Sequence, residues 1–203
     1  MTICFAPIFA GEYTSRADQL ILSSKYGKNK QISAKLFAAC SLFVMFFTLL
    51  TAIEFALILF AYGAGGANAP IQQYIPLLAY PLTMSESAVI LWVCTFFGAF
   101  LNLALTLLLS SKFKSPFGVM VIISALIIIT TMVSMTERIA WLHNLLCLLP
   151  TSMITGEALL SYVPYDLFGL IVLPYIFLPI YALAAIAVML PLARIVFRNC
   201  QIG

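Results

Sequence analysis

The side chains in this sequence that could take part in chemistry are few and far apart. There is one histidine, His143, and the five cysteines form no C-x-x-C pair: Cys4, Cys40, Cys94, Cys147 and Cys200. We interpret the cysteines as small apolar residues and His143 as a hydrogen-bonding residue near the membrane interface. The chain has no nucleotide-binding glycine loop, H-E-x-x-H pattern or G-x-S-x-G nucleophile elbow. The sequence therefore predicts no catalytic residue, metal site or cofactor, and argues against an enzyme.

Glu54 is the only acidic residue inside a strongly apolar segment. Counted from Lys35 at about 1.5 Å per residue, it lies roughly 28 Å along a helix, in the outer half of a bilayer. A carboxylate at that depth faces protein or water rather than lipid. We interpret Glu54 as a neutral or hydrogen-bonded residue that lines the interior, with Thr48 or Thr51 as local partners. It is a candidate polar residue of a translocation path, but without a basic residue in another span it does not indicate a proton relay.

The composition of the chain is that of an integral membrane protein, so membrane helices must position these residues. Of 203 residues, 64% are hydrophobic and 8% are charged, and the mean hydropathy is +1.11. A soluble domain carries about 25% charged residues. The net charge of +3 comes from basic residues in short stretches between apolar runs. This pattern reflects membrane topology, and we expect lipids rather than nucleic acid as partners.

The predicted fold is all-α, a polytopic helical membrane protein forming one transmembrane domain. A membrane helix needs about 20 mainly apolar residues, and four segments qualify: about 36–62, 88–109, 117–135 and 167–193. Residues 1–10 are apolar but too short to cross, and Pro7 disfavours an uninterrupted helix there. Two interpretations stay open for them, a segment lying among the headgroups and the end of a truncated span.

The basic residues predict one topology. Residues 11–35 hold five of the ten, residues 63–87 hold none, and the rest lie in the turn after the second span, in the next loop and in the tail. By the positive-inside rule, residues 11–35, the turn at 112–114 and the C-terminus are cytoplasmic. Residues 136–166 are then an extracytoplasmic loop, in which the apolar run 139–149 predicts a short helix.

The polar segment 12–35 predicts a short amphipathic helix, a turn at Gly27 and a basic lead-in to the first span. Ser15 and Asp18 fit a capping box, and apolar residues recur at helical spacing up to Ser24. One interpretation is a helix on the lipid surface, with lysines facing anionic headgroups. The other is a helix that docks on a soluble partner.

Several short motifs resemble those of one family. Glu12, the run Ile-Leu-Ser-Ser at 21–24, the run Tyr-Gly-Lys-Asn-Lys at 26–30 and Lys35 are similar to the cytoplasmic loop between the second and third spans of ABC-2 type transporter permeases. The order of the remaining elements agrees with that family, including a glycine-rich outside loop and a Leu-Leu-Pro at 148–150. The resemblance covers nearly the whole chain.

This resemblance implies a bacterial plasma-membrane permease subunit of an ATP-binding cassette exporter. Its partners would be a second permease copy and a cytoplasmic ATPase subunit. The family's coupling helix, which contacts the ATPase, would fall on Glu12, Tyr13, Arg16, Asp18, Gln19, Leu20, Ser23 and Ser24, with a basic flank at Lys25, Lys28, Lys30 and Lys35. Family members have six spans, so the first and most of the second would be missing here.

Two other functions fit the same residues. A membrane interaction or stability protein without transport activity would use the same docking segment. A small secondary transporter would use Glu54. The apolar spans suit peptides, lipids or drugs alike as substrates.

Overall fold

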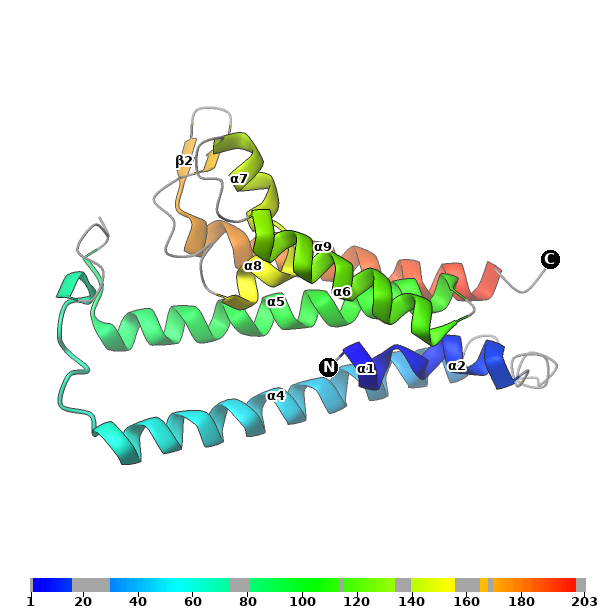
Figure 1. Cartoon of the computed structure of the whole chain (residues 1–203), viewed down its shortest axis with the longest axis horizontal. Coiled ribbons are helices and arrows are strands. Elements are labelled where there is room, and N and C mark those ends of the chain that lie inside the picture. The colour runs from blue at the N-terminus through cyan, green and yellow to red at the C-terminus, as the bar shows by residue number, and fades with distance from the viewer. Residues whose placement is uncertain are drawn as a thin grey trace. The chain divides into compact units, whose positions relative to one another are not determined.

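Three long apolar helices dominate the structure, a computed structural model that describes residues 2–15, 30–73, 81–113, 115–133, 140–155, 165–167 and 170–199. They are α4 (Ile32–Tyr62), α5 (Met84–Lys112) and α9 (Pro174–Asn199) (Figure 1). Each is long and apolar enough to cross a membrane. The described part of the chain is therefore that of an all-α protein compatible with several membrane crossings.

Shorter helices fill the segments before and between the long ones: α1 (Thr2–Phe5), α2 (Pro7–Ser15), α6 (Pro116–Val133), α7 (Ala140–Cys147), α8 (Pro150–Thr155) and a 3-10 turn, η2 (Ile71–Gln73). The third predicted span, 117–135, corresponds to α6. This helix is strongly apolar, but its 18 residues make it shorter than the other three. Residues 134 and 135 lie outside the described part of the chain, and the crossing of α6 stays a prediction.

The expected start of the last span is wrong. Residues 165–172 contain a small antiparallel pair, β1 (Tyr165–Leu167) and β2 (Leu170–Val172), with Tyr165 opposite Val172. Proline favours the first helical position, and the residue before it favours an extended backbone, so α9 begins at Pro174. Ile171 and Val172 are β-branched and suit a strand. Within the described residues, these two short strands form a small sheet in a mainly helical structure.

Local sequence signals set the other helix ends. At the start of α5, the backbone N–H of Thr83 donates to Glu86 Oε2 (2.9 Å), and the N–H of Glu86 donates to Thr83 Oγ1 (3.3 Å). This reciprocal capping box is the one its Thr-x-x-Glu spacing predicts. Pro116 is the first residue of α6. Gly63, with φ of 73°, ends α4 in the left-handed conformation that glycine adopts without strain.

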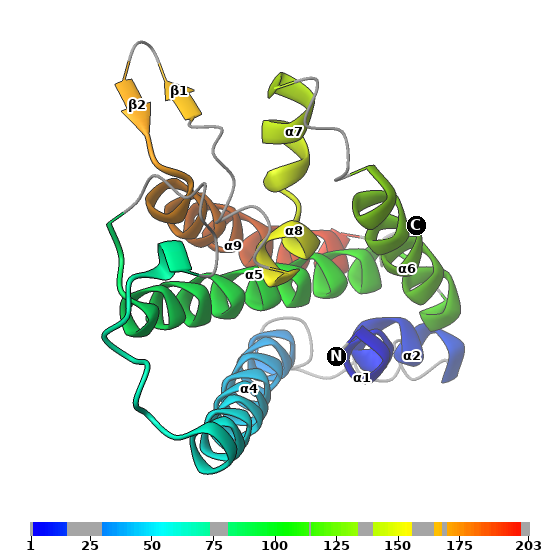
Figure 2. The same cartoon turned by 60° about the vertical axis from the view of Figure 1, so that its left-hand side comes forward.

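The chain divides into two compact units, and each long helix contributes to both. The first unit comprises Met1–Phe43, Phe100–Met135 and Leu183–Gly203. Its core is built around α1 and α2, where Phe5, Ala6, Phe9 and Ala10 are buried. Both short helices lie beside α6 (Figure 2), on which Ala6 packs against Val119 and Ile123. These four residues of the segment 1–10 are therefore part of a packed core.

The second unit comprises Val44–Ala99 and Thr136–Ala182. Aromatic rings join α4 to α5 within it, since Phe47 meets Trp92 and Phe96 at centroid distances of 6.1 and 5.2 Å. Tyr165 of β1 packs on Phe177 of α9 at 4.5 Å. Between α4 and α5, the chain folds back on itself, with the N–H of Met84 donating to the carbonyl of Ala69 at 2.9 Å.

Candidate functional site

A hydroxyl group from α5 holds the start of α2. Ser110 Oγ accepts hydrogen bonds from the backbone N–H groups of Phe9 (3.3 Å) and Ala10 (3.0 Å) and donates to the carbonyl of Ala6 (2.6 Å). The first N–H groups of a helix have no partner within it, and a nearby side chain normally caps them. Here the cap comes from about one hundred residues away. Ser110 therefore attaches α2 to α5 next to the helix break at Pro7.

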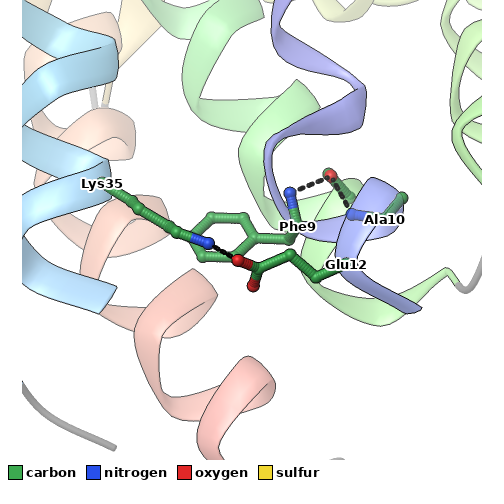
Figure 3. A network of polar contacts seen from close by, with 5 residues as sticks. Phe9, Ala10, Glu12 and Lys35 are labelled. Carbon is green, nitrogen blue, oxygen red and sulfur yellow. Dashed lines mark hydrogen bonds and ion pairs between the residues drawn. The ribbon is translucent and has the colours of Figure 1, made fainter. Parts of the chain in front are cut away.

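An ion pair fastens α2 to α4. The Nζ of Lys35 pairs with Oε1 of Glu12, and both side chains are partly buried. Figure 3 shows Lys35 reaching Glu12 beside the bonded backbone of Phe9 and Ala10. On the same helix, the ring of Phe9 packs on Phe197 of α9, with centroids 4.7 Å apart. The two ends of the segment 12–35 are therefore bound to each other and to the core of the first unit.

The helix that carries Glu12 differs in its bounds from the predicted one. The sequence places a boundary between residues 10 and 12 and a new helix from Ser15, but α2 runs through Gly11 from Pro7 to Ser15. Glu12 and Tyr13 thus belong to the same helix as the buried Phe9. Ser15 is the last residue of α2. Asp18, its predicted partner in the capping box, lies outside the described part of the chain, so that capping box stays a prediction.

Most of the predicted docking residues lie outside the described part of the chain: Arg16, Asp18, Gln19, Leu20, Ser23, Ser24, Lys25 and Lys28. Lys30 lies two residues before the start of α4 and is exposed. Of the predicted set, the structure brings together Glu12 and Lys35. Glu12 is predicted to contact the ATPase subunit, and Lys35 is predicted to lie in the basic flank of that contact. Their ion pair links these two predicted regions.

Glu54 is exposed on α4. The hydroxyls of its predicted partners, Thr48 and Thr51, donate to other groups. The hydroxyl of Thr48 donates to the carbonyl of Val44 at 2.8 Å, and that of Thr51 donates to Phe47 at 2.8 Å. Each hydroxyl has a single hydrogen, so neither donates to Glu54. Glu54 lies two turns beyond Phe47 on the same helix face, because seven residues make nearly two full turns. That face packs on α5 at Phe47 and is exposed at Glu54.

A cavity of about 610 Å³ lies between the second half of α4 and the first half of α5. Its walls include Thr51, Phe55 and Ile58 from α4 and Val89 and Trp92 from α5, and the small residues after Gly63 line it as well. The sequence reasoning missed it. The available signal was the run Gly-Ala-Gly-Gly-Ala at 63–67, which we interpreted only as a loop that avoids regular structure.

Another polar cluster joins α7 to β1. His143 Nε2 is 3.4 Å from Cys147 Sγ, and the hydroxyl of Tyr165 donates to the carbonyl of Asn144 at 3.1 Å. Burial raises the pKa of the Tyr165 hydroxyl, and the neighbouring Cys147 adds to the rise. Within the described residues, no three metal-binding side chains come together. The contact with Cys147 gives His143 the hydrogen-bonding role that we expected, and its position near the membrane interface stays a prediction.

Comparison with protein-family models, with curated proteins and with solved structures gives no match for this chain. The residues that the structure describes define a helical protein, in which three helices are long and apolar enough to cross a membrane.

Proposed function

We propose that this chain is the membrane-spanning permease subunit of an ATP-binding cassette transporter, most simply an exporter, driven by ATP hydrolysis on a separate subunit. The observation that carries the proposal is the attachment of α2 and α4 at the two ends of the segment 12–35, through the pair between Glu12 and Lys35. That segment is the one whose sequence resembles the ATPase-contacting loop of ABC-2 type permeases.

Because both of its ends are attached to helices, the segment 12–35 would transmit motion from a soluble partner to those helices. A push on residues 16–29 by a soluble partner would reach α2 through Glu12 and α4 through Lys35. From α2 it would pass to α5 through Ser110 and to α9 through Phe197. Packed helices move as discrete rigid bodies rather than deforming gradually. Nucleotide-driven motion would in this way reach three long helices from one loop.

The proposal includes a bacterial plasma-membrane location with the loop and the C-terminus in the cytoplasm, as the positive-inside rule predicts. A second permease copy would complete the pathway, and Glu54 would be a polar residue along it. A membrane interaction protein without transport activity would share the docking loop but no substrate path. The cavity between α4 and α5 favours transport over that alternative.

Co-purification tests the proposal. The tagged full chain is expressed with an ABC ATPase encoded in the neighbouring DNA and extracted in mild detergent. We expect the ATPase to stay on the tagged chain, and Arg16→Glu to lower the retained amount several-fold, because it reverses a charge on the docking helix. Arg198→Glu is the matched control, since Arg198 is an exposed basic residue at the end of α9, and it should have no effect.

Glu12 needs its own control because it pairs with Lys35. Glu12→Lys alone removes that pair, whereas Glu12→Lys combined with Lys35→Glu restores it with the charges exchanged. Recovery of ATPase binding in the double variant assigns Glu12 to holding α2, and continued loss assigns it to the partner contact. Absence of the ATPase from the purified wild-type chain, or full retention in both Arg16→Glu and Glu12→Lys, would show that the coupling assignment is wrong.

A further inference from the structure

The cavity between α4 and α5 has the size and lining of a small-molecule site. Its volume of about 610 Å³ lies within the range of about 300–1,000 Å³ typical of ligand pockets. Phe55, Ile58, Val89 and Trp92 supply apolar and aromatic walls. All of its lining residues belong to the second unit, so the site is built within one compact part of the molecule.

The cavity offers few hydrogen bonds to an occupant. The hydroxyls of Thr48 and Thr51, which line it, already donate to carbonyl groups of their own helix. A sugar or a peptide would lose its hydrogen bonds to water on entering and would recover few of them there. The lining therefore favours a compact apolar body.

Small residues keep the cavity open on the side of the loop. A Cβ atom built on Gly63 or Gly66 would meet no atom within 4 Å, and both residues line the cavity together with Ala64 and Ala67. A larger side chain at Gly66 would meet open space, whereas the positive φ of Gly63 disfavours any other residue there.

Glu54 gives the rim of this cavity a carboxylate. Thr51, three residues before Glu54, and Ile58, four residues after it, both line the cavity. Residues three and four apart are neighbours on a helix surface, about 5–6 Å between Cβ atoms. A helical side chain also leans toward the turn before its own Cα, which directs Glu54 toward Thr51.

The charge of Glu54 has no counterpart in the stretch that forms the cavity. Residues 44–99 contain no lysine, arginine or histidine, and their other carboxylate is Glu86. Glu86 already accepts hydrogen bonds from the N–H and the hydroxyl of Thr83 in the capping box of α5. A carboxylate in an apolar helix is stabilised by a cation, and an occupant of the cavity is placed to supply one.

We propose that this cavity binds a lipophilic cation, a compact apolar molecule with one positive charge, with Glu54 as its counter-ion and Trp92 as an aromatic wall. A cation near an indole face gains further stabilisation from the ring quadrupole. If the chain is a permease, this names the class of its substrate and so rests on the proposed function; binding itself requires no ATPase.

Equilibrium dialysis of the purified full chain in nonionic detergent tests the proposal. The probe is tetraphenylphosphonium, and tetraphenylborate, of nearly the same shape and opposite charge, is the control for apolar binding. We expect saturable binding of the cation above detergent-only samples and much weaker binding of the anion. Glu54→Gln should weaken cation binding about tenfold or more, because opposite charges near a protein surface attract more strongly than in bulk water.

Two further variants test whether the cation binds in this cavity. Glu86→Gln is the matched control, since glutamine keeps the capping box while removing the other carboxylate of residues 44–99, and it should leave binding unchanged. Ala88→Phe fills the cavity from α5 without touching Glu54 and should abolish binding. In a Trp141→Phe background, Trp92 is the remaining tryptophan, and its fluorescence should change as the cation binds.

Equal binding of the two probes, unchanged affinity in Glu54→Gln, or loss of affinity in Glu86→Gln would overturn the proposal. Retained affinity in Ala88→Phe would do the same, which keeps the test decisive if Glu54→Gln does not fold. Size-exclusion profiles identify variants that have lost their structure. Failure here leaves ATPase co-purification untouched, and failure of co-purification leaves cation binding untouched, so the two proposals fail separately.

Discussion

Ser110 shows how one side chain can fix the path of the chain. Proline at position 7 removes a backbone donor, and the first N–H groups of α2 need acceptors in a buried place. The hydroxyl of Ser110 supplies an acceptor for Phe9 and Ala10 and a donor for Ala6. One buried group thus satisfies three backbone groups that the helix break leaves without partners within α1 and α2.

Ser110→Ala should lower the free energy of unfolding by about 1–3 kcal/mol, because buried backbone groups lose their partner. Ser41→Ala is the matched control. Ser41 is exposed, and its hydroxyl donates to the carbonyl of Ala38 on its own helix, so we expect a change below about 0.5 kcal/mol. Thermal or SDS-induced unfolding of the purified chain measures both. Equal losses in the two variants would contradict the special role of Ser110.

Residue-level prediction from the sequence succeeded where partners are close along the chain. Thr83 and Glu86 are three residues apart, and their capping box follows from that spacing. Thr48 and Thr51 are also near Glu54, but each donates to a backbone carbonyl one turn back, which is always within reach in a helix. The bonds of Ser110 join residues about one hundred apart, and no local spacing encodes them.

At the scale of the elements, glycine decides how closely α5 and α8 approach. A Cβ atom on Gly98 would lie 2.7 Å from Cβ of Met153 and 3.2 Å from the carbonyl oxygen of Pro150. Real Cβ atoms do not approach that closely, so a larger residue at position 98 would force the two helices apart. The short helix α8 rests on α5 because position 98 has no side chain.

Gly98→Ala should therefore destabilise the protein by about 1–3 kcal/mol, the usual effect of overpacking. Gly118→Ala is the control. In α6, the added Cβ would come no closer than 4.0 Å to Cβ of Ser115, and alanine is the better helix former by up to about 1 kcal/mol. Unfolding midpoints should fall for the first variant and hold or rise for the second. A neutral Gly98→Ala would show that α8 does not rest on α5.

Element boundaries followed from the sequence only where a residue type has a strong local preference. Pro116 and Gly63 mark the start of α6 and the end of α4. The start of α9 was misplaced because hydropathy alone does not separate an apolar strand from the end of a span. Residues 170–172 are as apolar as the helix that follows, and the pairing of Tyr165 with Val172 is a tertiary contact.

At the scale of the whole molecule, the exposed surface indicates what surrounds the chain. Beyond Phe47, every side chain of α4 except the half-buried Thr51 is exposed, and Phe60 is 92% exposed. An uninterrupted apolar helix of this length would be costly in water. Lipid or a partner helix must cover it, as the mean hydropathy of +1.11 already indicates.

Composition and the placement of lysines thus predict that the chain lies in a membrane and predict its topology there. They do not predict that α1 and α2 form the core of the first unit, because that depends on burial of Phe9 and Ala10 against distant helices. Nor do they predict a cavity whose walls join residues of α4 to residues of α5.

Site-specific photo-crosslinking in cells tests the central claim most directly, that residues 12–35 deliver the work of an ATPase to the membrane helices. A photoreactive amino acid is placed at Leu20, in the predicted docking helix, or at Tyr62, at the other end of α4, with the neighbouring ABC ATPase co-expressed. The account predicts a crosslink to the ATPase from position 20 and none from position 62. No crosslink from position 20, or equal crosslinking from both positions, would contradict it.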